Sequence, residues 1–243
     1  MSGHSHWAGI KYKKQLADTQ KGKVFSKLAR EISIAAREGA DPEINSKLRV
    51  AIEKAKRMKM PWENIERAIK KGAGEISGEK LEEVLFEAYG PGGIAILIEG
   101  ITDNKNRAIN EVRQILERNK GKLVGEGGVK WMFERKGCIT VNFKPQTQNQ
   151  KSKEELEMIA IEAGAEDFYW HDNALDIYTK VEGLEKVKTG LADKGVEIEE
   201  SSLDWVAKEM LQVGDKEKRE LEVLFESLDE SETVQEIYSN LKS

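Results

Sequence analysis

The apolar residues of this 243-residue chain change their spacing near residue 75. Before that point they recur at three- and four-residue steps, which is the period of a helix with one buried face. After residue 80 they alternate or form short continuous runs, as the residues of β-strands do. Between these regions, residues 72–80 contain three glycines and a serine, a composition typical of a linker. We therefore expect a helical domain first and α+β structure after it.

Three helices are expected before the linker, over residues 22–38, 46–59 and 61–72. Asn45 suits the N-cap of the second helix, and Pro61 suits the first turn of the third. Three helices of this length make a minimal bundle.

Beyond the linker, residues 84–89 and 94–101 flank a glycine-rich turn and predict a hairpin. Asp103 or Asn104 is expected to cap the helix that follows, and residues 129–134 are expected to form a strand.

Residues 137–200 show the order βαββαβ, which is the ferredoxin-like arrangement. A strand over residues 206–213, a helix over 216–228 and a strand or short helical end over 234–238 are expected after it.

The predicted fold class is α+β with three domains, in which a basic helical bundle is followed by two ferredoxin-like domains. Residues 1–78 form the basic arm and bundle. Residues 79–135 and 206–243 form one split α+β domain, and residues 136–205 form a second one inserted into it.

Charge is distributed unevenly along the chain. Residues 1–78 hold 17 Lys and Arg against 9 Asp and Glu, a net charge of +8, whereas residues 79–243 hold 22 against 35, a net charge of −13. One interpretation is that helices carry solvated lysines in any case. The other is that the basic end meets an anion, and the commonest polymeric anion in a cell is nucleic acid. The early lysines have few acids at i,i+4 positions, which favours the second interpretation.

The candidate nucleic-acid contacts are the cations of the N-terminal third, with one aromatic residue. Lysine and arginine there would contact phosphates and give affinity without sequence information. Trp7 lies on the charged arm, where it is expected either to stack on a base or to dock on the bundle. The full set is Trp7, Lys11, Lys13, Lys14, Lys21, Lys23, Lys27, Arg30, Lys54, Lys56, Arg57, Lys70 and Lys71.

A second candidate contact lies at the predicted helix start after residue 104. Lys105, Asn106 and Arg107 would present one amide and two cations to the same partner. The competing interpretation, which we favour, is a capped and solvated first turn.

Other classes of function find little support in the sequence. The single cysteine, Cys138, excludes an internal disulfide and indicates a reducing, cytoplasmic compartment. It is expected in the core, and the three histidines are too scattered to predict a metal site. No apolar run approaches the roughly 18 residues of a membrane span. We expect no catalytic residues, metal, cofactor or membrane partner, and we favour a monomer.

The glycine-rich segments 90–93 and 125–128 precede strands rather than helices, so they are expected to be turns and not phosphate-binding loops. Among the tryptophans, Trp131, Trp170 and Trp205 are expected to be core anchors. Packing is also the default expectation for Trp62.

Long segments of the chain resemble the YebC family, which also includes a mitochondrial translational activator of a cytochrome oxidase subunit. The resemblance covers almost the whole chain. It rests on GHSHWAGIKYKKQLADTQKGKVFSKLAREI, REGADPEINSKLRVAIEKAKRMKMPWENIERAIKKGAGE, FEAYGPGGIAILIEGITDNKNRAINEVR, WMFERKG and EAGAEDF.

The resemblance implies a helical domain and two α+β domains, and members are described as transcriptional regulators that bind DNA. Some members resemble translation factors that act at the ribosome. A DNA-binding regulator and a ribosome-associated translation factor therefore both remain open, with a small-molecule sensor as a third hypothesis. The resemblance implies no catalysis.

Overall fold

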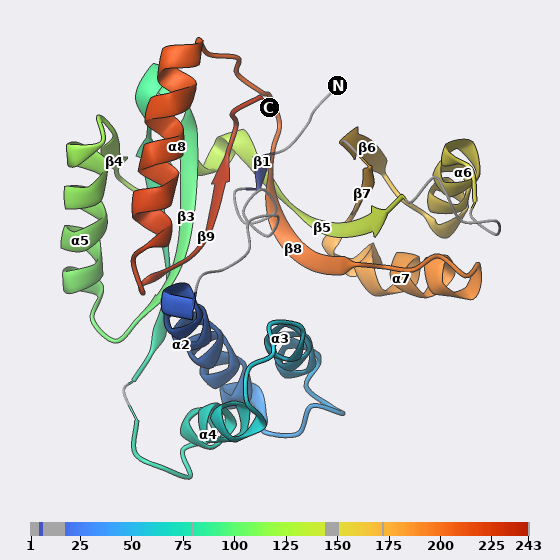
Figure 1. Cartoon of the computed structure of the whole chain (residues 1–243), viewed down its shortest axis with the longest axis horizontal. Helices are drawn as coiled ribbons and strands as arrows, with labels where there is room; N and C mark the ends of the chain where they lie inside the picture. The colour runs from blue at the N-terminus through green and yellow to red at the C-terminus, as the bar shows by residue number, and fades with distance from the viewer. Residues whose placement is uncertain (1–4, 7–17, 79, 144–150, 172, 243) are drawn as a thin grey trace. The chain divides into compact units, whose positions relative to one another are not determined.

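The computed structural model describes residues 5–6, 18–78, 80–143, 151–171 and 173–242, and it divides into two compact units (Figure 1). The larger unit comprises residues 6–129 and 214–237. The smaller unit comprises residues 130–213 together with residues 1–5 and 238–243.

The larger unit begins with three packed helices, α2 (Asp18–Ala35), α3 (Ser46–Arg57) and α4 (Trp62–Gly72), with a 3-10 turn η1 (Ala36–Glu38) after the first. The Asn45 side chain accepts a hydrogen bond from Leu48 N and donates to Ala35 O, so the predicted N-cap is confirmed and also fastens α3 to the end of α2. The helices share one apolar core, in which Ile32, Leu48 and Ile65 are fully buried. The periodic stripes in the sequence therefore predict this part of the fold.

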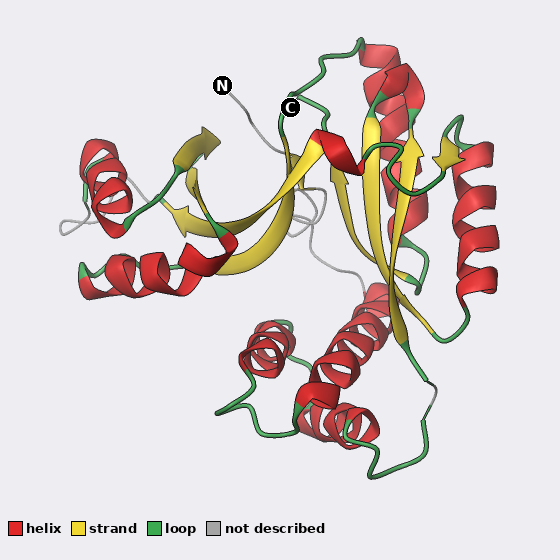
Figure 2. Cartoon of the chain, turned by 180° about the vertical axis from the view of Figure 1, so that it is seen from behind, coloured by secondary structure: helices red, strands yellow, loops and turns green. Residues whose placement is uncertain are grey.

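The remaining elements of the larger unit are the strands β2 (Glu82–Tyr89), β3 (Ala95–Thr102) and β4 (Lys122–Val124) and the helices α5 (Lys105–Arg118) and α8 (Asp215–Asp229). The three strands belong to a five-stranded sheet of order β1-β9-β3-β2-β4, which also contains β1 (Ser5–His6) and β9 (Val234–Ser239). Strands β2 and β3 form the predicted hairpin through the turn η2 (Pro91–Gly93), with Glu82 opposite Thr102 and Tyr89 opposite Ala95. Helix α8 crosses in front of the strands in Figure 1 and behind them in Figure 2.

The smaller unit contains the strands β5 (Phe133–Asn142), β6 (Asp167–His171), β7 (Ala174–Thr179) and β8 (Glu200–Ala207) and the helices α6 (Lys153–Ala163) and α7 (Leu184–Asp193). Its strand order, β6-β7-β5-β8, combined with the element order βαββαβ, is the predicted ferredoxin-like arrangement. Helices α6 and α7 lie side by side (Figure 2) and cover one face of the sheet, where Ile139, Leu175 and Ile177 are buried. The opposite face carries a smaller buried cluster of Cys138, Tyr178 and Val206, next to charged side chains such as Glu134 and Lys136.

Three predicted strands are wrong in whole or in part: the strand at residues 129–134, the last strand of the predicted βαββαβ order at residues 196–198, and the strand at residues 206–213. Residues Lys130–Met132 form a 3-10 turn, η3, and β5 begins only at Phe133. Trp131 in that turn is 65 % exposed, so the expectation that it is a core anchor is wrong. Residues 196–198 form no strand, since Val196 N donates to Leu191 O and closes the end of α7.

The predicted strand over residues 206–213 contains only the last two residues of β8 and, at Leu211, a single bridge to Leu241. Strand β4 is also not predicted from the sequence, because a strand of only three residues is too short to show an alternating pattern. In the larger unit the elements from β2 onward therefore follow the order ββαβ and then αβ. Of the two predicted ferredoxin-like domains, only the one in the smaller unit has the βαββαβ order.

Cations of α2 are paired with acids and carbonyl groups of distant segments of the larger unit. Lys27 Nζ lies 3.0 Å from Asp229 Oδ1 and donates to Asp229 O at 2.7 Å, and its side chain is only 13 % exposed. The Arg30 guanidinium donates to Ile101 O, to Glu232 O and to Glu232 Oε2 at 3.0–3.2 Å. Each side chain thus satisfies both a carboxylate and a backbone carbonyl that is distant in sequence.

Helix α3 contributes a third pairing of this kind. Lys54 Nζ lies 3.2 Å from Glu31 Oε2 on α2 and 2.9 Å from Glu236 Oε1 on β9. The side chains of Lys54, Glu31 and Glu236 are each less than a third exposed, so these charges are shielded from salt better than a fully exposed pair is. Lys27, Arg30 and Lys54 together connect the helices to the β-sheet part of the larger unit.

Replacing Lys27 by methionine is expected to lower the free energy of unfolding by about 1–2 kcal/mol, because the aliphatic stem is kept while both bonds to Asp229 are lost. The matched control is Lys47→Met, whose ion pair with Glu38 is exposed on both sides and should matter by less than about 0.5 kcal/mol. Urea denaturation followed by circular dichroism measures both variants. Equal stability of the two variants would contradict the role given to Lys27.

Candidate nucleic-acid interface

The predicted contact residues fall into three groups in the structure. Trp7, Lys11, Lys13 and Lys14 lie outside the described residues. Three others, Lys27, Arg30 and Lys54, are engaged in the ion pairs described above. The rest lie on the surface of the three helices: Lys21 and Lys23 on α2, Lys56 and Arg57 on α3, and Lys70 and Lys71 on α4.

The connection between α3 and α4 exposes a group of cations. Helix α3 ends in a basic last turn, where positive side chains also complement the negative end of the helix dipole. Lys59 then adopts a left-handed backbone with φ 58°, while Met60 N donates to Ala55 O and the Met60 side chain is buried. This tight reversal leaves the neighbouring cations in solvent. Together with two cations of α4 they form the α3–α4 basic surface, defined as Lys56, Arg57, Lys59, Arg67 and Lys71, all exposed.

Trp62 lies directly after this reversal, in the first turn of α4. Pro61 precedes it with φ −57°, which suits a helix start. The expectation that Trp62 packs is wrong, because 56 % of the residue is exposed. Lys56 Nζ lies 5.4 Å from the centroid of its ring, a cation–π distance.

The last turn of α4 is basic as well, and its two lysines differ. Lys70 Nζ lies 2.8 Å from Glu66 Oε1, one helical turn away, and this hydrogen bond raises the pKa of Lys70. Lys71 is exposed. Lys70 therefore has part of its charge balanced within its own helix, whereas Lys71 faces solvent.

The second candidate contact, at the start of α5, has the geometry of a capped first turn. Asn104 is the N-cap, and its side chain accepts a hydrogen bond from Arg107 N at 3.1 Å. Lys105 pairs with Glu82 at 3.0 Å, and the Arg107 side chain pairs with Asp103. Asn106 is exposed beside them. Because Lys105 and Arg107 are both paired with nearby carboxylates, we expect this turn to attract an anionic partner less strongly than the α3–α4 basic surface does.

The glycine-rich segment 125–128 binds a carboxylate of the protein itself. Gly127 N and Val129 N donate to Glu87 Oε1 and Oε2, each at 2.7 Å, and Glu87 is only 4 % exposed. These backbone amides are thus occupied by a buried side chain of β2. The other segment, residues 90–93, closes the β2–β3 hairpin by bonds such as Gly93 N to Gly90 O. Both segments are structural turns, as predicted.

Glu87→Ala is expected to lower the free energy of unfolding by about 2–4 kcal/mol, because two buried N–H groups lose their acceptors. Glu87→Gln should fall in between, since an amide side chain offers one oxygen where the carboxylate offers two. Glu83→Ala, at an exposed position of the same strand, is the control and should change stability by less than about 0.5 kcal/mol. Urea denaturation measures the series, and a Glu87→Ala variant as stable as the control would contradict this role.

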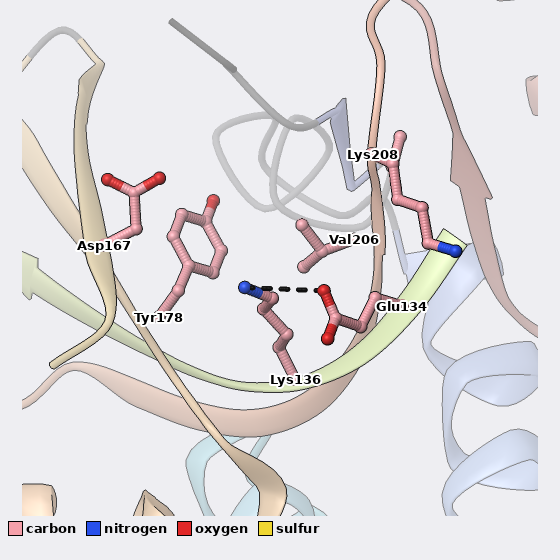
Figure 3. Close-up of a pocket in the computed structure, with 7 residues that line it drawn as sticks. Glu134, Lys136, Asp167, Tyr178, Val206 and Lys208 are labelled. Atoms are coloured by element: carbon pink, nitrogen blue, oxygen red, sulfur yellow. Dashed lines mark ion pairs between the residues drawn. The ribbon is translucent and has the colours of Figure 1, made fainter. Parts of the chain in front are cut away.

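The smaller unit contains a polar pocket of about 300 Å³ on the sheet face that α6 and α7 leave open (Figure 3). Lys136 points into it and lies 3.6 Å from Glu134 and 3.4 Å from Glu166. The pocket therefore has cations and anions that balance each other. Its lining residues are Glu134, Lys136, Asp167, Tyr178, Val206, Ala207 and Lys208.

Two nucleophilic groups next to this pocket are held in their neutral forms. Burial raises the pKa of the Cys138 thiol, and the neighbouring Asp204 raises it further. Burial likewise raises the pKa of Tyr178, with a contribution from Asp176. Cys138 is 8 % exposed, which confirms the prediction that it is a core residue. Its thiol lacks the thiolate character that a catalytic cysteine needs near neutral pH.

Metal-binding clusters and membrane-spanning helices are both absent from the described residues. Within them, no group of three or more His, Cys, Asp or Glu side chains is arranged to hold a metal ion. The helices among the same residues include none that is both long and apolar enough to cross a membrane.

Comparisons with known proteins agree over the whole length of the chain. The family profile described as TACO1/YebC protein N-terminal domain matches residues 5–75, and the profile described as TACO1/YebC second and third domain matches residues 81–241. Proteins named probable transcriptional regulatory protein from Aquifex aeolicus and Thermoanaerobacter pseudethanolicus are 47 % and 45 % identical. Each match covers all of this chain and 96 % and 97 % of the relative.

A solved structure gives the same result for the fold. The crystal structure of a conserved hypothetical protein from Aquifex aeolicus matches with a TM-score of 0.86 and 45 % sequence identity. The match covers 98 % of this chain and 97 % of that one.

Proposed function

Since the chain belongs to the TACO1/YebC family, whose members compared above are named as transcriptional regulatory proteins, we propose that it is a cytoplasmic, non-catalytic regulator that binds nucleic acid. The binding element is the α3–α4 basic surface, extended by Lys21 and Lys23 and by Trp7, Lys11, Lys13 and Lys14 of the basic arm.

The observation that carries the proposal is the sorting of cations in the three helices. Lys27, Arg30 and Lys54 pair with acids of the same unit and are mostly buried, whereas the five cations of the α3–α4 basic surface are exposed. Residues 54–71 hold seven Lys and Arg against two Glu. Such a surface lowers the energy of a polyanion beside it, and counterion release on binding makes the affinity depend on salt.

Phosphate contacts of this kind position a nucleic acid without reading its sequence. Lysine-rich helix ends suit this task, because the flexible ammonium groups follow a backbone of either DNA or RNA. The names of the relatives favour DNA as the target. The exposed Trp62 beside Lys56 favours a second candidate, an RNA with unpaired bases such as ribosomal RNA.

Reversing three charges of the surface, by Arg57→Glu, Arg67→Glu and Lys71→Glu in one variant, is expected to weaken binding to duplex DNA and to RNA by at least about tenfold. The slope of log affinity against log salt should fall by about three, one for each lost phosphate contact. Fluorescence anisotropy with labelled strands of about 20 nucleotides, between about 0.05 and 0.3 M salt, measures both quantities.

The control makes the same charge change on the smaller unit, with Lys180→Glu, Lys186→Glu and Lys194→Glu, all at exposed positions. It should keep wild-type affinity within about twofold. Equal losses in the two variants would mean that only net charge matters, and no loss in the first variant would reject the interface. The affinities of the wild-type protein for the DNA and for the RNA, compared at about 0.15 M salt, show which of the two is the preferred ligand.

A further inference from the structure

Trp62 is a large aromatic residue that the core of the three helices does not use. That core is formed by buried residues of α2, α3 and α4, with Val24, Phe25, Ala29, Met58 and Ile69 packed against its edge. Trp62 belongs to neither set, and 56 % of it is exposed. The exposed part of the indole is therefore open to a ligand outside the bundle.

The surroundings of Trp62 specify the chemistry of that partner. Lys56 lies over the ring at 5.4 Å, and Arg57 and Lys59 are exposed in the preceding turn of chain. An apolar protein anchor would have to bury these ammonium and guanidinium groups together with the ring. A nucleotide strand instead offers a flat π-system and a phosphate every few ångströms, which matches an indole flanked by cations.

We propose that Trp62 and Lys56 form a stacking site for an unpaired base of single-stranded nucleic acid, with Arg57 and Lys59 contacting the adjacent phosphates. This inference rests on the proposed function and narrows its ligand to strands with accessible bases. Bases in a duplex are already stacked on their neighbours, so an indole gains little from them. Stacking is tolerant of sequence, and the site therefore selects single strands without selecting a particular base.

The chain also contains a matched control for exposure alone. Trp131 is 65 % exposed, but it lies in the smaller unit, where the side chain of the adjacent Lys130 is directed at the ring of Trp205 at 5.2 Å. Trp131 O accepts a hydrogen bond from Lys208 Nζ. Because Trp131 is exposed but is not part of the α3–α4 basic surface, its replacement should leave nucleic-acid binding unchanged.

The test compares three ligands with the full-length protein. They are a single strand of about 20 nucleotides, the same strand with abasic sites in place of its bases, and the duplex of the same sequence. Trp62→Ala is expected to weaken binding to the intact single strand about tenfold and to change binding to the other two ligands less than about twofold. Trp62→Phe should recover most of the loss, and Trp131→Ala should bind all three ligands as the wild type does.

The outcomes separate this inference from the proposed function. Equal losses of Trp62→Ala on all three ligands, or no loss on any, would overturn the stacking site. If the reversal of Arg57, Arg67 and Lys71 still weakens binding as expected in that case, the proposed function survives without the stacking site. A wild-type protein that binds none of the three ligands would reject both. Circular dichroism of the Trp62 variants confirms folding, which the absence of Trp62 from the core leads us to expect.

Discussion

The pairing of helix cations with acids from the other end of the chain is the interaction on which the larger unit depends. Lys27 and Asp229 are separated by 202 residues in sequence, and Lys54 and Glu236 by 182. These pairs join a net positive segment to a net negative one, so the uneven charge of the chain is partly resolved within the fold. Each pair also provides hydrogen bonds for partly buried polar groups, which would destabilise the fold if they were left without partners.

Lys27 and Lys54 are less available for phosphate contacts than the cations of the α3–α4 basic surface are. The ammonium groups of Lys27 and Lys54 lie against carboxylates and would have to lose these contacts to reach a phosphate. The cations of the α3–α4 basic surface are exposed, and no ion pair to the β-sheet holds Lys56, Lys59 or Lys71 among the described residues. Nucleic acid bound at the proposed surface would therefore leave the ion pairs between the helices and the sheet intact. Substitutions at that surface should change the affinity for nucleic acid, whereas substitutions of Lys27 and Lys54 should change the stability of the fold.

Local spacing was sufficient to predict the three helices, the β2–β3 hairpin and the βαββαβ order of the smaller unit, because each depends on periodicity and on nearby caps or turns. Features set by distant residues could not be predicted. Trp62 and Trp131 lie in ordinary apolar patterns, and only the tertiary structure shows that the cores form without them. Likewise, Glu87 reads as a polar residue in an alternating strand, and its amide partners lie 40 and 42 residues away. The lysines of the helices look alike in sequence, and their division into paired and exposed sets comes from the fold.

Acetylation of lysines in the full-length protein, with and without saturating single-stranded nucleic acid, tests the central claim most directly. Mass spectrometry then gives the reactivity of each lysine. We predict that Lys56 and Lys71 become protected on binding, that Lys27 and Lys54 react slowly in both states, and that Lys186 and Lys194 of the smaller unit do not change. Protection of Lys186 and Lys194, with Lys56 and Lys71 as reactive as in the free protein, would contradict the account.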